Sequence, residues 1–318
     1  MHKARYNSLC LDLSLQPTGP LLIKSGQFAA DPSLPDMQFV RTFRAGAGET
    51  IYIPGSSLKG VVRSFVEKAL RTLDANCPPG PADDKSWRWA CASFEAKKEE
   101  RKDKSKWNCP QFLNELAEER HKELQSCEIY RYSCGACRTF GHTRLRGRAS
   151  FTDLYPESDV KTETRYGVAI SRLTHAVAQG PFEMEVVVAG SFSGQLVLEN
   201  YELWQLGLVA AAIEAMNQGL LKLGFGKNRG FGHVRLQVKQ AMIDEVVPLG
   251  QSTAIRGLVS FVDEQARQSY RLFGPELLTG LPEPQTRELG GFYERRMYDA
   301  AGWQAISAKA IAALQAGG

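Results

Sequence analysis

Residues Gly224–Gly232 read GFGKNRGFG, a glycine-rich stretch that joins an apolar helical run to an alternating strand pattern. Four glycines and two cations, Lys227 and Arg229, fall within these nine residues. Glycine allows positive φ angles and close backbone approach, and a glycine-rich turn can point several N–H groups at one phosphate. The stretch therefore indicates a turn that contacts a phosphate backbone. A tight turn with two solvated cations is the alternative interpretation.

The patterns on either side of this turn predict an α+β fold. Leu9–Leu15 alternates apolar and polar residues, as a half-buried strand does, and His233–Val238 is a second strand candidate. Helical spacing of apolar residues appears in Val61–Leu73 and Glu202–Gln218. Strands separated in this order by helices predict a ferredoxin-like or RRM-like sandwich over residues 1–249.

Three segments do not fit that sandwich. Residues 76–137 combine prolines, a mixed charge run and most of the cysteines, which indicates an insertion. Residues 165–188 contain two strand patterns around a Gly-Pro break and predict a projecting hairpin. Residues 250–318 carry helical runs without an assignable motif, and we expect a C-terminal helical extension there.

Composition limits the class of protein and leaves several kinds of partner open. The chain has 318 residues, 43% hydrophobic and 23% charged, with a formal net charge of +4. These values are ordinary for a globular protein with a buried core, and the mild positive charge permits an anionic partner without requiring one. We find no signal-peptide pattern and no apolar run of about 18–20 residues, so we expect a cytoplasmic protein with no membrane partner.

A second candidate anion-binding turn lies near the start of the chain. Gly55-Ser56-Ser57-Leu58-Lys59-Gly60 separates a short strand candidate from the Val61–Leu73 helix pattern. Ser56 or Ser57 could cap that helix, whose N-terminal N–H groups and dipole would favour an anion beside Lys59 and Arg63. A capped helix with surface cations is the alternative. We expect this turn and the glycine stretch to converge on one polynucleotide strand.

The cysteines indicate a structural zinc site. Six of the seven lie between positions 77 and 137, and in a reducing compartment such clusters bind metal more often than they form disulfides. The spacing of Cys127, Cys134 and Cys137 predicts three ligands, because tetrahedral Zn²⁺ commonly takes two from one tight turn. Our first choice for the fourth is Cys109, and the further candidates are Cys91, Cys77 and His121. Unligated thiols are the competing interpretation.

A cationic strand follows the last of these cysteines. Arg144, Arg146 and Arg148 alternate along Thr143–Ser150, which places them on one face of an extended segment. Cations two residues apart on a strand are about 6.5–7 Å apart, close to the phosphate spacing of an extended nucleic-acid strand.

Four motifs together resemble the RAMP superfamily of CRISPR systems. They are IPGSSLKG at residues 53–60, CGACRTFG at 134–141, GVAISRLT at 167–174 and the Gly224–Gly232 stretch. Their order over residues 8–238 is similar to that of the backbone subunit of type III effector complexes. The resemblance implies an RRM-like palm, a zinc-bearing finger or lid, and a hairpin thumb around residues 165–188. It also implies that the partners are CRISPR guide RNA, target RNA and other RAMP subunits.

The resemblance further implies which residues contact RNA and which drive cleavage. An aspartate upstream of the IPGSSLKG motif, followed five residues later by an arginine, supports metal-dependent endonuclease cleavage of target RNA in the family. Asp36 with Arg41 has that spacing, and Asp31 is the competing candidate. A carboxylate there would hold Mg²⁺ or another divalent ion while the adjacent 2′-OH attacks. The implied RNA contacts are Arg41, Ser56, Ser57, Lys59, Arg63, Arg165, Arg172, Lys227 and Arg229.

Two functions besides an endoribonuclease subunit also fit the sequence. One is a non-catalytic RNA-binding scaffold, as in type IV or degenerate type III complexes. The second is a guide-processing RNA endonuclease, which would use a histidine base, although none of the five histidines lies in the expected loop.

Overall fold

The computed structural model describes most of the chain. The described residues are 3–26, 35–46, 48–73, 88–100, 102–103, 106–157, 159–246 and 253–316. None of the helices in these ranges is both long enough and apolar enough to cross a bilayer.

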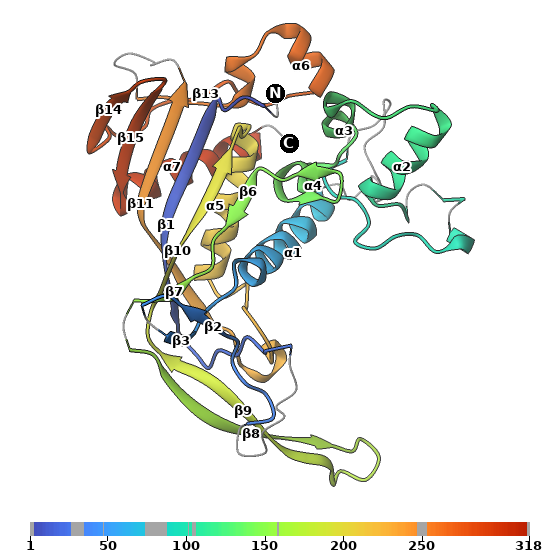
Figure 1. Ribbon diagram of the computed structural model, residues 1–318, viewed down its shortest axis with the longest axis vertical. Coiled ribbons are helices and arrows are strands. Elements are labelled where there is room, and N and C mark those ends of the chain that lie inside the picture. Colours follow the sequence, from blue (N-terminus) through green and yellow to red (C-terminus); the bar gives the residue numbers. More distant parts are fainter. Residues whose placement is uncertain are drawn as a thin grey trace.

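A central antiparallel sheet forms the core of the protein (Figure 1). Strand β1 (Asn7–Pro17) pairs with β10 (Phe192–Glu199) on one side and β11 (Val234–Val246) on the other, and β6 (Ala149–Phe151) extends the sheet beyond β10. The order β11-β1-β10-β6, with one helix after β1 and one after β10, is that of a ferredoxin-like unit. The α+β prediction is confirmed.

Alternating side chains explain why the sheet buries one face. Leu9, Leu11, Leu13 and Leu15 of β1 are all buried beneath the helices. Helices α1 (Gly55–Leu73) and α5 (Leu203–Asn217) contact each other and the sheet. Helix α5 is apolar on every side because α7 (Ala300–Ala316) packs against it.

The C-terminal region contains the predicted helices and, in addition, strands that the sequence patterns did not indicate. Strand β15 (Tyr293–Asp299) pairs with β11, and β14 (Thr286–Gly290) pairs with β15, so this hairpin widens the central sheet. Helix α6 (Glu264–Tyr270) and the short pair β12 (Ile255–Arg256) and β13 (Leu277–Leu278) lie between β11 and that hairpin in the chain.

Two structures project from the core. The insertion carries α2 (Cys109–Glu119) and α3 (Ser126–Arg131), and α4 (Gly135–Phe140), whose residues are all buried in the core, follows α3. The long pair β8 (Lys161–Ile170) and β9 (Val177–Ala189) forms a hairpin that extends away from the sheet, and we call it the thumb hairpin (Figure 1). The remaining short elements are β2 (Arg41–Arg44), β3 (Gly48–Ile51), β4 (Gly141–His142), β5 (Leu145–Arg146), β7 (Tyr155–Pro156), and the 3-10 turns at Lys98–Glu100, Lys227–Arg229 and Leu258–Phe261.

Candidate metal centre and nucleic-acid interface

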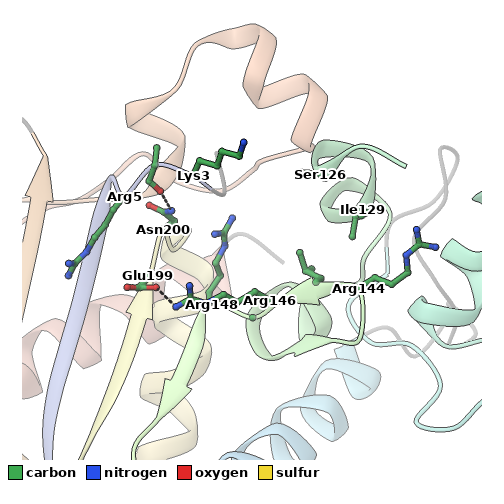
Figure 2. A pocket seen from close by; sticks show the side chains of 12 residues that line it. Lys3, Arg5, Ser126, Ile129, Arg144, Arg146, Arg148, Glu199 and Asn200 are labelled. Atoms are coloured by element: carbon green, nitrogen blue, oxygen red, sulfur yellow. Dashed lines mark hydrogen bonds and ion pairs between the residues drawn. The ribbon is translucent and has the colours of Figure 1, made fainter. Parts of the chain in front are cut away.

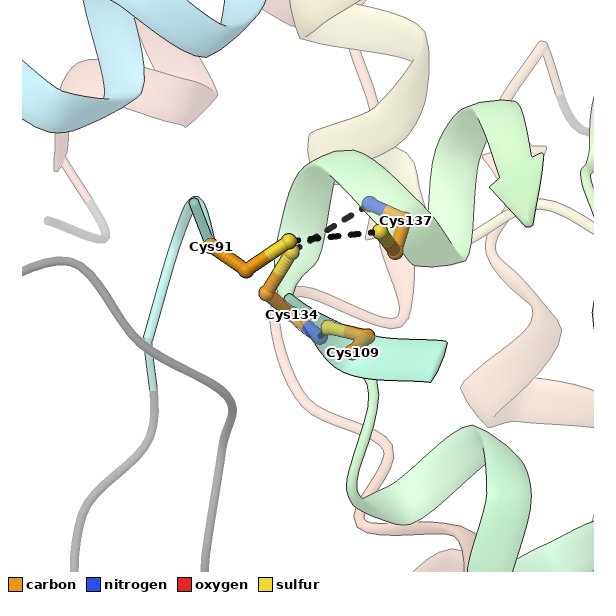
Figure 3. Close-up of side chains that lie close together, drawn as sticks. All are labelled: Cys91, Cys109, Cys134 and Cys137. Carbon is orange, nitrogen blue, oxygen red and sulfur yellow. Dashed lines mark hydrogen bonds between the residues drawn. The ribbon is translucent and has the colours of Figure 1, made fainter. Parts of the chain in front are cut away.

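Four buried cysteines meet beneath α1. The sulfurs of Cys91, Cys109, Cys134 and Cys137 all lie within 4.8 Å of one another (Figure 3). Cys134 and Cys137 come from the turn that opens α4, where the Cys134 sulfur accepts a hydrogen bond from the Cys137 N–H at 3.5 Å. Cys109 opens α2, and Cys91 arrives on an extended segment. Three separate segments therefore supply one four-sulfur cluster.

The spacing of these sulfurs suits a metal ion. The Cys91 and Cys137 sulfurs are 3.7 Å apart. A tetrahedral zinc with Zn–S bonds of about 2.3 Å places its sulfurs about 3.8 Å apart, whereas a disulfide requires about 2.05 Å. The Cys109 sulfur accepts a hydrogen bond from the Cys134 N–H at 3.3 Å, a contact that supports a thiolate. This cluster can hold a metal ion such as zinc.

The predicted ligand set needs one correction, because Cys91 takes the place that we assigned to Cys127. Cys127 lies half-buried in the first turn of α3, where its thiol contacts the Gln125 side chain at 3.8 Å. The six residues between Cys127 and Cys134 include most of helix α3, so the two sulfurs do not approach each other. Of the remaining candidates for the fourth ligand, His121 is exposed and does not join the cluster, and Cys77 lies outside the described residues.

The start of α1 differs from the predicted anion-binding turn. The helix begins at Gly55, so Ser56 and Ser57 lie in its first turn and neither serves as the N-cap. The Ser57 N–H donates to the Pro54 carbonyl at 2.9 Å, and the Gly55 N–H donates to the Asp153 carboxylate at 2.8 Å. An acidic side chain thus occupies part of the site that we expected an anion to fill.

Lys59 and Arg63 have different environments on α1. The Arg63 side chain donates hydrogen bonds to Glu67 at 2.8 Å, to the Gly141 carbonyl at 2.8 Å and to the Cys137 sulfur at 3.7 Å. Its guanidinium is therefore bound to internal acceptors beside the cysteine cluster. Lys59 is half-buried, and burial together with the nearby Arg63 lowers its pKa. No carboxylate in the described part of the chain pairs with Lys59, which leaves its charge for an external anion.

The glycine stretch forms the predicted turn, which we call the glycine turn (Gly224–Gly232). Gly226 and Gly230 have φ angles of +71° and +84°, a conformation that favours glycine. A Cβ on Gly224 would lie 2.2 Å from the Leu22 carbonyl oxygen. The same oxygen accepts a hydrogen bond from the Phe225 N–H at 2.7 Å. The turn is therefore fixed against the segment that follows β1.

The two cations of the glycine turn face α1 and the thumb hairpin. Burial and the nearby Lys68 of α1 lower the pKa of Lys227. The Arg229 guanidinium lies 5.5 Å from the centre of the Phe182 ring on β9. No carboxylate among the described residues pairs with either cation. The glycine turn therefore brings two unneutralised charges to the junction of α1 and the thumb hairpin.

The two predicted anion-binding turns both reach α1, but on different flanks. Lys59 lies beside Arg63, and Lys227 lies within electrostatic range of Lys68. Nine residues at about 100° each separate Lys59 from Lys68, which places them on opposite sides of the helix. A strand that touches both turns would have to cross the exposed ridge of α1 between them.

The predicted catalytic loop is docked against the thumb hairpin. The exposed Asp36 accepts a hydrogen bond from the Glu183 N–H of β9 at 2.9 Å through one carboxylate oxygen, and its other oxygen has no partner in the described ranges. Arg41 forms an ion pair with Glu185 of β9, with one N–O distance of 2.8 Å, so its guanidinium is used inside the protein. Asp31 lies outside the described residues.

The thumb hairpin presents apolar as well as basic side chains. Arg165 is exposed and pairs with its neighbour Glu163, and Arg172 is exposed in the turn between β8 and β9. Leu173 in the same turn is 91% exposed, and Ile170 and Tyr166 are also exposed. Exposed apolar side chains do not stabilise an isolated monomer, and a cluster of them on one surface is typical of a site that contacts a partner.

Aromatic side chains form a platform that sequence reasoning missed. The rings of Tyr52 and Tyr155 stack with centroids 6.0 Å apart, and the Arg44 guanidinium lies 4.6 Å from the Tyr155 ring centre. Phe43, beside Arg44, is 80% exposed. Aromatic and guanidinium planes of this kind can stack on nucleic-acid bases. In the sequence, only the nearby aromatic residues Phe43 and Tyr52 offered a signal, since Tyr155 joins them through the fold.

The family model of the RAMP superfamily matches residues 14–235 of the chain. This chain belongs to the RAMP superfamily. The matched range includes α1, β6, β10 and α5 of the ferredoxin-like unit, together with the cysteine cluster and the thumb hairpin, but only the last four residues of β1 and the first two of β11. No curated protein matches the sequence.

Membership of the RAMP superfamily supports the broad functional prediction. RAMP proteins are in general CRISPR-associated RNA-binding proteins that act in multi-subunit complexes. The cations of the glycine turn, the unneutralised Lys59 and the exposed thumb hairpin of this RAMP protein fit that general role.

Proposed function

We propose that this RAMP protein is a backbone subunit of a type III CRISPR effector complex and binds CRISPR guide RNA through its sugar–phosphate chain. The observation that carries the proposal is the position of Lys227 and Arg229, which stand unneutralised on a rigid glycine turn between α1 and the thumb hairpin. Unneutralised cations on a fixed backbone recognise phosphates irrespective of base. The platform of Tyr52 and Tyr155 would add sequence-tolerant base stacking.

Target-RNA cleavage through Asp36 is the second part of the proposal. Its free carboxylate oxygen lies on an exposed loop beside β9, where it could hold a divalent ion such as Mg²⁺ against a scissile phosphate. One observation favours a non-catalytic scaffold instead. Arg41, the arginine that accompanies Asp36 in the family pattern, is paired with Glu185 of β9.

The double change Lys227→Ala and Arg229→Ala tests the RNA-binding proposal. Removing two phosphate contacts is expected to weaken binding of single-stranded RNA by about tenfold to a hundredfold. The slope of log affinity against log salt should fall by about 1.4, because each lost contact contributes about 0.7 for a single strand. Fluorescence anisotropy over a salt series measures both quantities.

A matched control removes the same charge elsewhere. The variant Lys97→Ala with Lys102→Ala takes two exposed cations from the insertion and should leave the affinity and the salt slope near wild-type values. Equal weakening by the two double variants would mean that RNA responds only to net charge. A loss confined to particular base sequences would also contradict phosphate recognition by the glycine turn.

A further inference from the structure

A cationic cavity of about 420 Å³ opens at the far end of the central sheet (Figure 2). Its walls are the segment before β1, the start of α3, residues 144–148 and the end of β10. Strand β1 runs from Asn7, beside this cavity, to Pro17, which pairs with Val234 just after the glycine turn. Its 11 residues at about 3.3 Å each separate the two ends by roughly 35 Å. The cavity is therefore distinct from the proposed RNA-binding surface.

Arg148 is the unusual side chain in this cavity. It is only 6% exposed, and among the described residues neither its Nε nor its Nη2 atom has a hydrogen-bond partner. Its guanidinium lies 5.0 Å from the centre of the Tyr130 ring, a contact that leaves these two N–H groups unsatisfied. Burying a charged group without a partner is strongly unfavourable. Such an arrangement is expected where a ligand completes the site.

The carboxylates near Arg148 are already used by other groups. Glu199 is bound to Arg146 at 2.9 Å, and Arg146 is largely exposed. The buried Glu202 accepts hydrogen bonds from the Tyr130 hydroxyl at 2.7 Å and from the Phe273 N–H at 2.9 Å. Neither carboxylate neutralises Arg148 through a hydrogen bond.

Lys3 brings additional positive charge to the same cavity, and Arg144 lies at its edge. Lys3 is exposed, and no acidic partner for it occurs in the described ranges. Arg144 donates to neutral acceptors, the Leu113 carbonyl at 3.3 Å and the Asn114 side chain at 2.9 Å, and therefore keeps its charge. Figure 2 shows Lys3 and Arg148 in the space between the end of β10 and α3. Among the described residues, Arg148 and Lys3 are thus left without a carboxylate in the cavity, whereas the Arg144 guanidinium points away from them toward α2.

We propose that this cavity binds a phosphate group, with the Nε and Nη2 atoms of Arg148 as a bidentate donor to two of its oxygens. That edge of a guanidinium matches two oxygens of one phosphate. A phosphate monoester carries about −1.5 to −2 charges, which suits the two unneutralised cations Arg148 and Lys3 better than the single charge of a carboxylate. The cavity volume is within the range of small-ligand sites, so it has room for a nucleotide or the phosphorylated end of a strand.

Titration calorimetry with the full chain tests the proposal with four probes. These are inorganic phosphate, adenosine 5′-monophosphate, and one short RNA with either a 5′-phosphate or a 5′-hydroxyl. Wild-type protein is expected to bind one phosphate group per chain. If the 5′-phosphorylated RNA binds more tightly than its 5′-hydroxyl form, the ligand of the site is a strand end. If the two RNAs bind equally and the mononucleotide binds tightly, the ligand is a free nucleotide.

Arg148→Met distinguishes a ligand-binding arginine from a structural one through two measurements, the unfolding temperature and phosphate binding. Without ligand the variant should unfold at or above the wild-type temperature, because it removes an unsatisfied buried charge, and it should lose phosphate binding. The matched variant Arg235→Met changes an exposed arginine near the other end of β1 and should bind phosphate normally. The exposed Lys3→Ala keeps the test decisive if Arg148→Met misfolds, since it should weaken phosphate binding about fivefold.

Three results would overturn the proposal. They are no phosphate binding by the wild-type protein, unchanged phosphate binding by Arg148→Met or by Lys3→Ala, and tighter binding of a hexaglutamate peptide than of any phosphate probe. The last result would assign the cavity to an acidic protein partner. Affinity for the 5′-hydroxyl RNA through the glycine turn is measured independently, so failure here leaves the proposed function untouched.

Discussion

Cys91→Ser is expected to purify without the zinc ion that we expect in the wild-type chain, and to unfold at a temperature lower by about 6 °C. The Cys91 sulfur is one of four buried sulfurs within 4.8 Å of one another, so a serine removes one ligand from a closed site. A structural zinc contributes about 10–16 kcal/mol in small domains. Losing about 4 kcal/mol of unfolding free energy lowers the unfolding midpoint of a chain of this size by about 6 °C. Elemental analysis and thermal unfolding measure the two effects.

Cys127→Ser is the matched control for this prediction. It changes a cysteine of the same region that lies outside the cluster, so one zinc per chain and a near wild-type unfolding temperature are expected. Loss of zinc from Cys127→Ser with retention in Cys91→Ser would show that the metal is held by the set predicted from spacing. Retention of zinc in both variants would mean that neither cysteine is required.

Asp36→Asn is expected to reduce Mg²⁺-dependent cleavage of target RNA by about a hundredfold to a thousandfold in the assembled complex, in line with loss of one essential electrostatic group. Asparagine keeps a side-chain oxygen that can accept the hydrogen bond from the Glu183 N–H, so the loop should remain docked on β9. It removes the negative charge that would hold the metal ion. Cleavage of labelled RNA and guide-RNA affinity should be measured together, with the affinity unchanged.

Asp159→Asn controls for a charge change near the thumb hairpin. Asp159 is an exposed aspartate just before β8, and cleavage by this variant should equal that of the wild type. If Asp36→Asn cleaves normally at every site that this subunit serves, Asp36 has no part in the reaction. If the wild-type complex binds target RNA but never cuts it with Mg²⁺, the scaffold function that the Arg41–Glu185 pair favours is the correct one.

Local patterns predicted much of the fold because short-range physics determines them. The alternating leucines of β1 can bury one face only as a strand, and the apolar spacing of residues 202–218 suits a buried helix. The strands at the C-terminus escaped prediction because their pattern is weak. Pairing with β11 stabilises β15, and β11 lies too far away in the sequence for a short-range pattern to reveal this pairing.

The candidate site was less predictable because its residues meet through long-range contacts. Sequence spacing grouped Cys127 with Cys134 and Cys137, but helix α3 separates Cys127 from the cluster, and a distant extended segment delivers Cys91. Arg63 and Arg41 were predicted to face RNA, and the structure directs them to the Cys137 sulfur and to Glu185. Cations are common in sequence, and only the fold shows which of them a carboxylate or another internal acceptor already occupies.

The sequence by itself determined the α+β class, the glycine turn, the C-x-x-C pair and the RAMP resemblance, because each depends on residues close together in the chain. Tertiary structure decided the membership of the sulfur cluster, the placement of Lys59 and Lys227 on opposite flanks of α1, and the burial of Arg148 without a partner. Those features depend on distances between segments far apart in sequence, and such distances exist only once the sheet has paired and the helices have packed.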